Sequence, residues 1–229
     1  MKELSPSRAA KSSGTLPRVA RPRDQVKRRR ELVAATSRLV ARKGLANVTL
    51  RDVADAAGVT SGAVLYYYDG LDELFTAAYD RGVERFCAER EQAVAALDDP
   101  AGRLALAIHL GVPESPDDSE IRILYELESV AFRDAACAAL MAAYVERQVA
   151  MYTGILEAGA ATGAFRLAGD ARTVARNIVA LEDGQGLYVL MDRDDPAAVE
   201  RRILAYAAAA TGIPPERLTR RTAARDRGS

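Results

Sequence analysis

Gly58 divides a short part of the chain into two segments, each with its own helix start signal. In VTLRDVADAAGV, Thr49 occupies an N-cap position and Asp52 follows three residues later, which is the spacing of a capping box. Gly58 is a helix stop signal, and either Thr60 or Ser61 caps the segment that follows it. Two short helices joined by a tight turn are therefore predicted.

The remainder of the chain has helical patterning as well. Apolar residues recur every three or four positions in DQVKRRRELVAATSRLVARKG and in the long segment after Asp69–Gly70. No alternating pattern long enough for a strand is present, so the predicted fold class is all-α. Further helices are predicted near residues 100–110, 117–132, 134–160, 170–192 and 196–211.

Charge is distributed unevenly along the chain. Residues 1–43 contain 13 Lys or Arg and three acids, although the whole chain has a formal net charge of zero. A basic head on an acidic body is expected where one end of a protein meets a polyanion. Residues 1–23 are rich in Ser, Pro and basic side chains and are predicted to form a disordered basic arm, with a polar tail over residues 216–229.

The arrangement within residues 24–70 is that of a helix-turn-helix unit: a basic helix, a short helix, a tight turn and a second short helix. The small residues Ser61–Ala63 would let the second short helix approach the floor of the DNA major groove. Tyr66 and Tyr67 could reach phosphates or pack on thymine methyls. As an alternative, adjacent tyrosines could simply fix a short helix to its neighbours, and such units also occur outside DNA-binding proteins.

A known family has these features in the same order. The chain resembles the DNA-binding domain of the TetR family of transcriptional regulators over about residues 25–80, LVAATSRLVARKGLANVTLRDVADAAGVTSGAVLYYYDGLDELFTAAY. The shared features are the Ala-rich first helix ending in Lys-Gly, Thr49, the motif VADAAGVTSGAV, the aromatic cluster, and a leucine four residues after Gly70. The resemblance implies a homodimeric repressor, not an enzyme, that binds a palindromic double-stranded DNA operator and releases it on binding a small-molecule effector.

The resemblance also assigns roles to individual residues. Tyr68, where the family usually has Phe, is expected to anchor the small core. Leu65 and Leu71 stand where a tyrosine and a lysine are common, so the arginines at 28–30 would supply more of the electrostatic attraction; taken alone, that run would be interpreted as a solvated face. The predicted DNA-binding residues are Arg28, Arg29, Thr49, Arg51, Thr60, Ser61, Gly62, Ala63, Tyr66 and Tyr67.

Residues 71–215 are expected to form a helical ligand-binding and dimerisation domain. Two strongly apolar helices, near 170–192 and 196–211, are joined by a short turn and are rich in small residues that suit close helix packing. In the family, the last two long helices pair with those of a second subunit as a four-helix bundle, and these two fit that role. Packing within one subunit is the alternative.

Two adjacent acids, Glu182 and Asp183, interrupt one of these apolar helices. Neighbouring helical positions point about 100° apart, so at least one of the acids faces inward or across an interface. A buried acid needs a partner, which a cationic effector could supply, with nearby aromatic side chains contributing cation–π attraction. A solvated or interface-paired Glu182 is the alternative. The predicted ligand-binding residues are Tyr125, Glu128, Phe132, Met141, Tyr144, Glu182 and Tyr188.

The sequence gives no sign of catalysis. No metal cluster, phosphate loop or nucleophile–base spacing is recognisable, and His109 is the only histidine, so no catalytic residue, metal or cofactor is predicted. Cys87 and Cys137 are interpreted as reduced core thiols. The longest apolar run is too short to span a bilayer and there is no signal peptide, so a cytoplasmic protein is expected. A helical enzyme or carrier remains the alternative, but it would have little use for the basic head.

Overall fold

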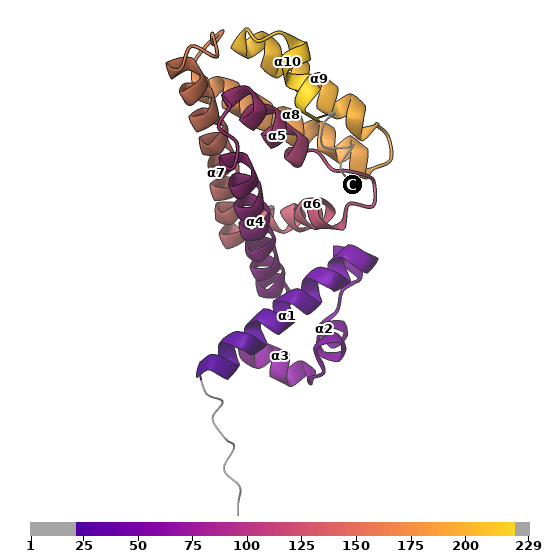
Figure 1. Ribbon diagram of the computed structural model, residues 1–229. Helices are drawn as coiled ribbons and strands as arrows, with labels where there is room; N and C mark the ends of the chain where they lie inside the picture. The colour runs from indigo at the N-terminus through magenta and orange to yellow at the C-terminus, as the bar shows by residue number, and fades with distance from the viewer. Residues whose placement is uncertain (1–21, 223–229) are drawn as a thin grey trace, which may run out of the picture.

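The computed structural model describes residues 22–222, apart from the side chains at 22, 23, 119, 120 and 219–222. All regular secondary structure in this range is helical, which confirms the predicted all-α fold class. Figure 1 shows the three N-terminal helices below a larger helical body. The elements are α1 (Pro22–Lys43), η1 (Leu45–Asn47), α2 (Leu50–Ala57), α3 (Ser61–Tyr67), α4 (Leu71–Ala95), α5 (Pro100–Gly111), α6 (Ser119–Ala131), α7 (Ala135–Ala161), α8 (Ala171–Leu190), α9 (Pro196–Thr211) and α10 (Pro215–Thr222).

The caps expected from the sequence fix the two short helices. The Thr49 hydroxyl accepts a hydrogen bond from the Asp52 N–H at 3.2 Å, and the Asp52 carboxylate accepts one from the Thr49 N–H at 2.8 Å, which completes the capping box. Gly58 ends α2 in the left-handed conformation (φ 65°, ψ 38°), where a side chain would be strained. Thr60, not Ser61, caps α3. Local chemistry therefore determines the helix-turn-helix geometry.

A small core holds the N-terminal helices together. Val53 of α2, Val64 of α3 and Leu74 of α4 have no exposed surface. Tyr68 is 6% exposed, and its hydroxyl donates a hydrogen bond to the Arg29 carbonyl oxygen at 3.3 Å. The prediction that Tyr68 is the inward anchor of this core is confirmed.

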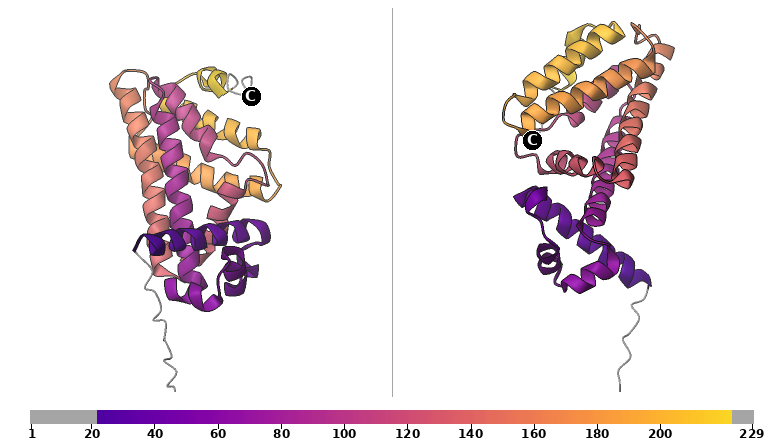
Figure 2. Two further views of the ribbon diagram at one scale, coloured as in Figure 1. Left: turned by 60° about the horizontal axis from the view of Figure 1, so that its bottom comes forward. Right: turned by 180° about the vertical axis from the view of Figure 1, so that it is seen from behind.

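The helix-turn-helix unit and the body share structural elements. Helix α4 starts next to α3 and runs into the body beside α7, which points in the same direction (Figure 2). Helix α6 belongs to the body by sequence, yet Ile123, Leu127 and Val130 are buried in the same core as α1 and α2. A movement of α4 or α6 would therefore be transmitted to the helix-turn-helix unit.

The body has a second core at the other end of α4. Helices α5, α7, α8, α9 and α10 enclose it, and its fully buried side chains include Leu104, Ile108, Ile178 and Ile203. Helices α8 and α9 pack against each other and form one side of the body (Figure 1). Among residues 22–222, no helix is both long and apolar enough to cross a membrane.

The chain ends differ from expectation at two places. The predicted polar tail over 216–229 is wrong for its first part, because α10 occupies Pro215–Thr222 and packs on α5 and α9. A proline at the first helical position favours this start, and Leu218 anchors the helix with no exposed surface. At the other end α1 begins at Pro22, so the predicted arm lies outside the described residues except for positions 22 and 23, which are helical.

Candidate functional site

Helix α3 presents a continuous exposed face. Gly62, Leu65 and Tyr66 are spaced three and four positions apart and lie on one side of the helix, opposite the buried Val64. Leu65 is 51% exposed and Tyr66 is 71% exposed. Large apolar side chains this open to water are unusual on a short helix, and they mark this face as a contact surface.

Some of the predicted contact residues around α3 are exposed, whereas others contact neighbouring residues within the fold. The Tyr67 ring is half-buried and packs edge-on against Tyr66, with ring centroids 5.0 Å apart. Arg29 is engaged within the fold: its guanidinium donates to the Tyr67 carbonyl oxygen and lies 4.7 Å from the centre of the Tyr68 ring. Arg29 thus connects α1 to the end of α3.

The remaining predicted contacts lie on the same end of the molecule. Arg28 pairs with Glu31 at 2.8 Å, and the exposed Arg51 is 3.9 Å from Asp55. Both pairs lie on the surface, where such contacts contribute little to stability. Thr49, Thr60 and Gly62 are exposed, whereas Ser61 and Ala63 are partly exposed.

A buried polar network lies at the centre of the body. The Arg90 guanidinium, on α4, is 2% exposed and donates to Glu182 on α8 at 2.7 Å, to Gln148 at 2.6 Å, to the Tyr152 hydroxyl at 2.6 Å and to the Ala107 carbonyl oxygen at 2.6 and 3.0 Å. The Tyr152 hydroxyl also donates to Glu182. Each of the three guanidinium nitrogens of Arg90 thus donates to an acceptor, and Glu182 already has a cationic partner within the chain.

Two further carboxyl groups near this network lack such a partner. Glu128 on α6 and Asp183 on α8 form no ion pair with a described residue. Burial, with the nearby charge of Asp183, raises the pKa of Glu128 to about 7. Burial raises the pKa of Asp183 to about 6, with Arg90 opposing the shift. Glu182 therefore contacts the guanidinium directly, Asp183 is influenced by its charge, and Glu128 lies near Asp183.

Aromatic rings line the same interior. Tyr79 and Phe86 on α4 both meet the edge of Tyr144 on α7, with centroid distances of 6.5 and 6.3 Å. The Tyr125 hydroxyl on α6 donates to the Asp183 carbonyl oxygen at 3.0 Å. Burial and the charges of Glu128 and Asp183 raise the pKa of Tyr79, which places its ring near both acids.

Several buried polar atoms in this interior are unsatisfied. Within the described residues, the Tyr79 hydroxyl, Nε2 of Gln148 and Oε2 of Glu182 are buried without a hydrogen-bond partner. Buried polar groups are normally paired, because an unpaired one costs free energy. All three belong to residues of the Arg90 network or to the aromatic side chains beside it.

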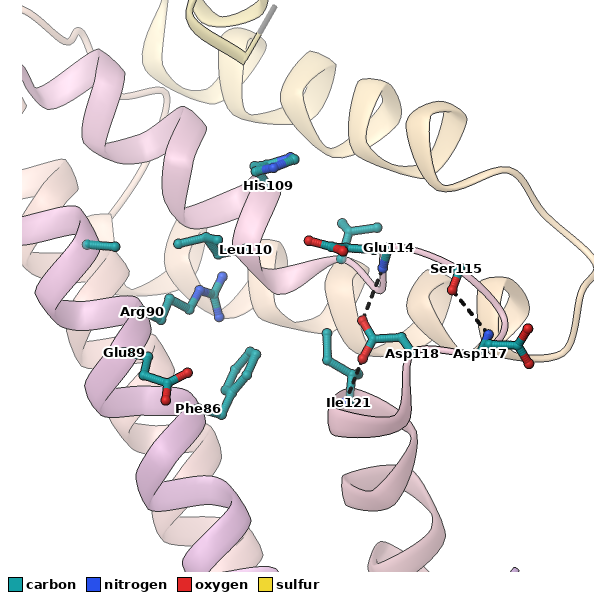
Figure 3. A pocket seen from close by; sticks show the side chains of 12 residues that line it. Phe86, Glu89, Arg90, His109, Leu110, Glu114, Ser115, Asp117, Asp118 and Ile121 are labelled. Carbon is teal, nitrogen blue, oxygen red and sulfur yellow. Dashed lines mark hydrogen bonds between the residues drawn. The ribbon is translucent and has the colours of Figure 1, made fainter. Parts of the chain in front are cut away.

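A cavity of about 550 Å³ opens beside this network, between α4, α5 and the segment that leads into α6 (Figure 3). Phe86 and Arg90 line the cavity and also contact the tyrosines described above. Its polar lining is mainly acidic, and His109 contributes a ring that contacts Glu200 at 3.1 Å. The acidic lining residues are Glu89, Glu114, Asp117 and Asp118.

The structure brings together only part of the predicted ligand set. Tyr125, Glu128, Tyr144 and Glu182 lie in or beside the polar interior, and none of the predicted residues lines the cavity itself. Phe132 is 95% exposed at the end of α6. Tyr188 is 53% exposed on the outer side of α8, and Met141 packs on the N-terminal core.

Sequence reasoning missed the contribution of α4 to this interior. Tyr79, Phe86 and Arg90 are spaced seven and four residues apart, so they share one face of the helix. An arginine on the same face as buried aromatics was the available signal that this face encloses a polar site. Among the described residues, no cluster of His, Cys, Asp or Glu could hold a metal ion.

One contact links this interior to the helix-turn-helix unit. Glu126 follows Tyr125 on α6 and accepts a hydrogen bond from the Leu45 N–H at 3.2 Å, at the junction between α1 and η1. Arg122 lies 3.9 Å from Glu126 on the same helix. Helix α6 therefore touches the polar interior with one face and the N-terminal unit with the other.

The fold and this geometry define a helix-turn-helix DNA-binding protein with a polar interior site in a helical body. Comparison with known proteins supplies the family. Residues 32–78 match the family described as bacterial regulatory proteins, tetR family, and residues 100–212 match the C-terminal domain of the BetI-type transcriptional repressors. The chain belongs to the TetR family, whose members are DNA-binding transcription factors and not enzymes.

Individual relatives agree with this assignment. The chain is 31% identical over 152 residues to the HTH-type transcriptional repressor KstR2 of Rhodococcus jostii, which covers 61% of this chain and 68% of the relative. A TetR transcription regulator from Haloarcula marismortui has a similar structure, with a TM-score of 0.73 and 25% identity over 81% of this chain and 99% of the other. The multidrug binding protein EbrR, solved with imidazole, has a TM-score of 0.59 and 28% identity over 78% and 94% of the two chains.

Proposed function

We propose that the protein is a cytoplasmic homodimeric repressor that binds a palindromic operator and releases it when a small organic cation enters the polar interior of its body. The observation that carries the effector part is that the partly buried acids Glu128 and Asp183 have no ion-pair partner, while Arg90 is paired with Glu182. The DNA-binding part rests on family membership and on the exposed face of α3.

The charge of the interior favours a positively charged effector. Arg90 neutralises Glu182 and leaves Glu128 and Asp183 unpaired. Partial burial of a carboxylate without a partner is unfavourable, and a bound cation would reduce that cost at both positions. The sequence singled out Glu182 as the acid that meets the effector, but its contact with Arg90 makes Glu128 and Asp183 the stronger candidates.

The aromatic rings suit the same chemistry. A cation over the face of a tyrosine or phenylalanine is attracted by the ring quadrupole, and the attraction grows when water is excluded. Tyr79 lies near both unpaired acids and Tyr144 lies near Asp183, while Phe86 lines the cavity and packs against Tyr144. The acidic cavity lining would attract a cation before it reaches this interior. EbrR, a relative named for multidrug binding, was solved with imidazole, a small nitrogen base.

Two helices can carry the signal to the DNA-binding unit. Helix α4 lines the interior through Tyr79 and Arg90 and starts at the end of α3. Helix α6 contributes Tyr125 and Glu128 to the interior and contacts Leu45 through Glu126. A cation that draws Glu128 and Asp183 together would shift α6 relative to α1, and this shift would change the orientation of α3.

Helices α8 and α9 are the proposed dimer interface. Leu187, Tyr188 and Met191 near the end of α8 are 43 to 55% exposed. Such exposed apolar side chains on neighbouring turns are typical of a surface that a second subunit covers. This placement gives Tyr188 a role between subunits instead of in the ligand site.

The effector hypothesis is tested by calorimetric titration and thermal shift with choline, benzyltrimethylammonium and imidazolium, each matched to sodium chloride. Choline has a neutral isostere, 3,3-dimethylbutan-1-ol, which has the same shape without the charge. We expect saturable binding of at least one cation to the wild-type chain. If that cation is choline, the neutral isostere should bind at least tenfold more weakly. The double variant Glu128→Gln with Asp183→Asn should lose cation binding. Equal effects of the cations and sodium would overturn the effector hypothesis.

A matched control separates charge from packing. Glu146→Gln removes an acid that pairs with Arg172 and Arg176 on the surface. This variant should retain cation binding, because the Glu146 side chain lies on the surface and its partners are Arg172 and Arg176. Sedimentation of the wild-type chain and of Tyr188→Glu tests the interface, and a dimer that persists unchanged in Tyr188→Glu would contradict the assignment of α8.

A further inference from the structure

Helix α3 lacks the side chains that usually read bases by hydrogen bonding. Its sequence, SGAVLYY over Ser61–Tyr67, contains no Arg, Lys, His, Asn, Gln, Asp or Glu. Two-point recognition of guanine requires Arg or Lys, and that of adenine requires Asn or Gln. Only hydroxyl groups and apolar surface remain for reading sequence from this helix. Thymine is the base that exposes an apolar group, its C5-methyl, in the major groove.

Gly62 has no internal reason to be glycine. Its backbone dihedrals are those of an ordinary helix, and a Cβ atom added at this position would meet only the Thr60 hydroxyl, at 4.0 Å. Glycine destabilises a helix interior relative to alanine, so a folding argument would favour alanine here. Without a side chain at Gly62, the backbone of α3 is uncovered on its exposed face, which allows another surface to approach closely.

Leu65 supplies the apolar surface next to this gap. It is 51% exposed while its neighbour Val64 is fully buried, so the core holds α3 without help from Leu65. Tyr66, which is more exposed still, is held by the edge of the Tyr67 ring at 5.0 Å. Gly62, Leu65 and Tyr66 together form an apolar reading face of α3.

We propose that Leu65 reads thymine through its C5-methyl group in each operator half-site, with Gly62 allowing the approach and Tyr66 covering the adjacent backbone. Sequence recognition by α3 is then an apolar contact, and affinity comes from the phosphate contacts of the surrounding basic residues. This inference rests on the proposed placement of α3 in the major groove.

The test begins with a duplex selected from a random library by the wild-type chain. Each thymine is then replaced singly by deoxyuridine, which lacks only the C5-methyl group. We expect at least one thymine per half-site at which the replacement weakens binding about fourfold, the equivalent of one buried methyl group. In Leu65→Ala the same position should give equal affinity for thymine and uracil.

A control variant makes the result specific. Phe132→Ala removes another exposed apolar side chain, one outside α3, and should retain the full uracil effect. Unchanged melting temperatures of both variants would show that they are folded. Uniform affinity across all uracil duplexes, or an unchanged uracil effect in Leu65→Ala, would overturn the inference. Salt-dependent binding of the selected duplex tests the proposed DNA binding independently of thymine reading.

Discussion

The Arg90–Glu182 pair makes the sharpest prediction about stability. Both side chains are 2% exposed, and the Glu182 oxygen that Arg90 contacts also accepts from Tyr152. The packing is tight, since a Cβ atom at Gly111 would lie 2.2 Å from that oxygen. Replacing Glu182 by Gln keeps a carbonyl acceptor but leaves the buried guanidinium without a carboxylate in contact with it.

The expected loss follows from this geometry. Breaking a buried ion pair from one side costs about 3–5 kcal/mol, and the retained amide oxygen places Glu182→Gln near the lower end. For a chain of this size about 1 kcal/mol corresponds to roughly 2–4 °C in melting temperature. A decrease of about 10 °C is therefore expected by calorimetry or circular dichroism, compared with little change in the surface variant Glu146→Gln.

A double variant distinguishes a buried charge from lost packing. Arg90→Met with Glu182→Leu removes both charges and fills the space with apolar atoms, so it should be more stable than Glu182→Gln alone. The reasoning is refuted if Glu182→Gln melts within 2 °C of Glu146→Gln, a threshold of about 1 kcal/mol or less. It is also refuted if the double variant loses as much as the sum of the two single variants.

Three further predictions concern the exposed face of α3 and the free acids. Gly62→Ala should raise the unfolding free energy by about 0.5–1 kcal/mol, seen in thermal melts, yet weaken DNA binding in an anisotropy titration; a gain in both would contradict the role of Gly62. Tyr66→Phe should weaken operator binding at constant melting temperature, whereas Tyr68→Ala should cost about 3 kcal/mol or more in denaturant unfolding, and equal stability losses would mean that both rings serve the core. Burial and Asp183 raise the pKa of Glu128 from 4.5 to about 7, so the free energy of unfolding should decrease as the pH rises through that interval. Thermal melts from pH 4.5 to 8 should show a smaller decrease in Glu128→Gln than in the wild type.

The sequence contained most of the fold because the fold is set locally. Thr49, Asp52 and Gly58 determine where α2 begins and ends, and the helix predictions for α5 to α9 agree with the observed bounds to within about two residues. Helix α10 was not predicted because a single buried side chain, Leu218, holds an otherwise polar segment, and such a tertiary contact leaves no periodic pattern.

The interior site was harder to predict because it depends on partners distant in sequence. Glu182 was singled out as an acid in an apolar helix, but its partner Arg90 lies 92 residues away on α4. Asp183 pairs with nothing comparable, and only the three-dimensional arrangement separates the two neighbouring acids. Phe132 has a suitable residue type for an aromatic pocket, yet its position at the end of α6 leaves it in water.

The proposed function requires that a cation bound in the polar interior of the body control DNA binding. The most direct test is the anisotropy of a labelled operator duplex, selected with the wild-type chain and titrated at constant ionic strength with the cation that binds best. This cation should release the operator from the wild type, and release should require at least tenfold more cation when Glu128→Gln and Asp183→Asn are combined. Release of both proteins at the same concentration, or no release of the wild type at saturation, would contradict it.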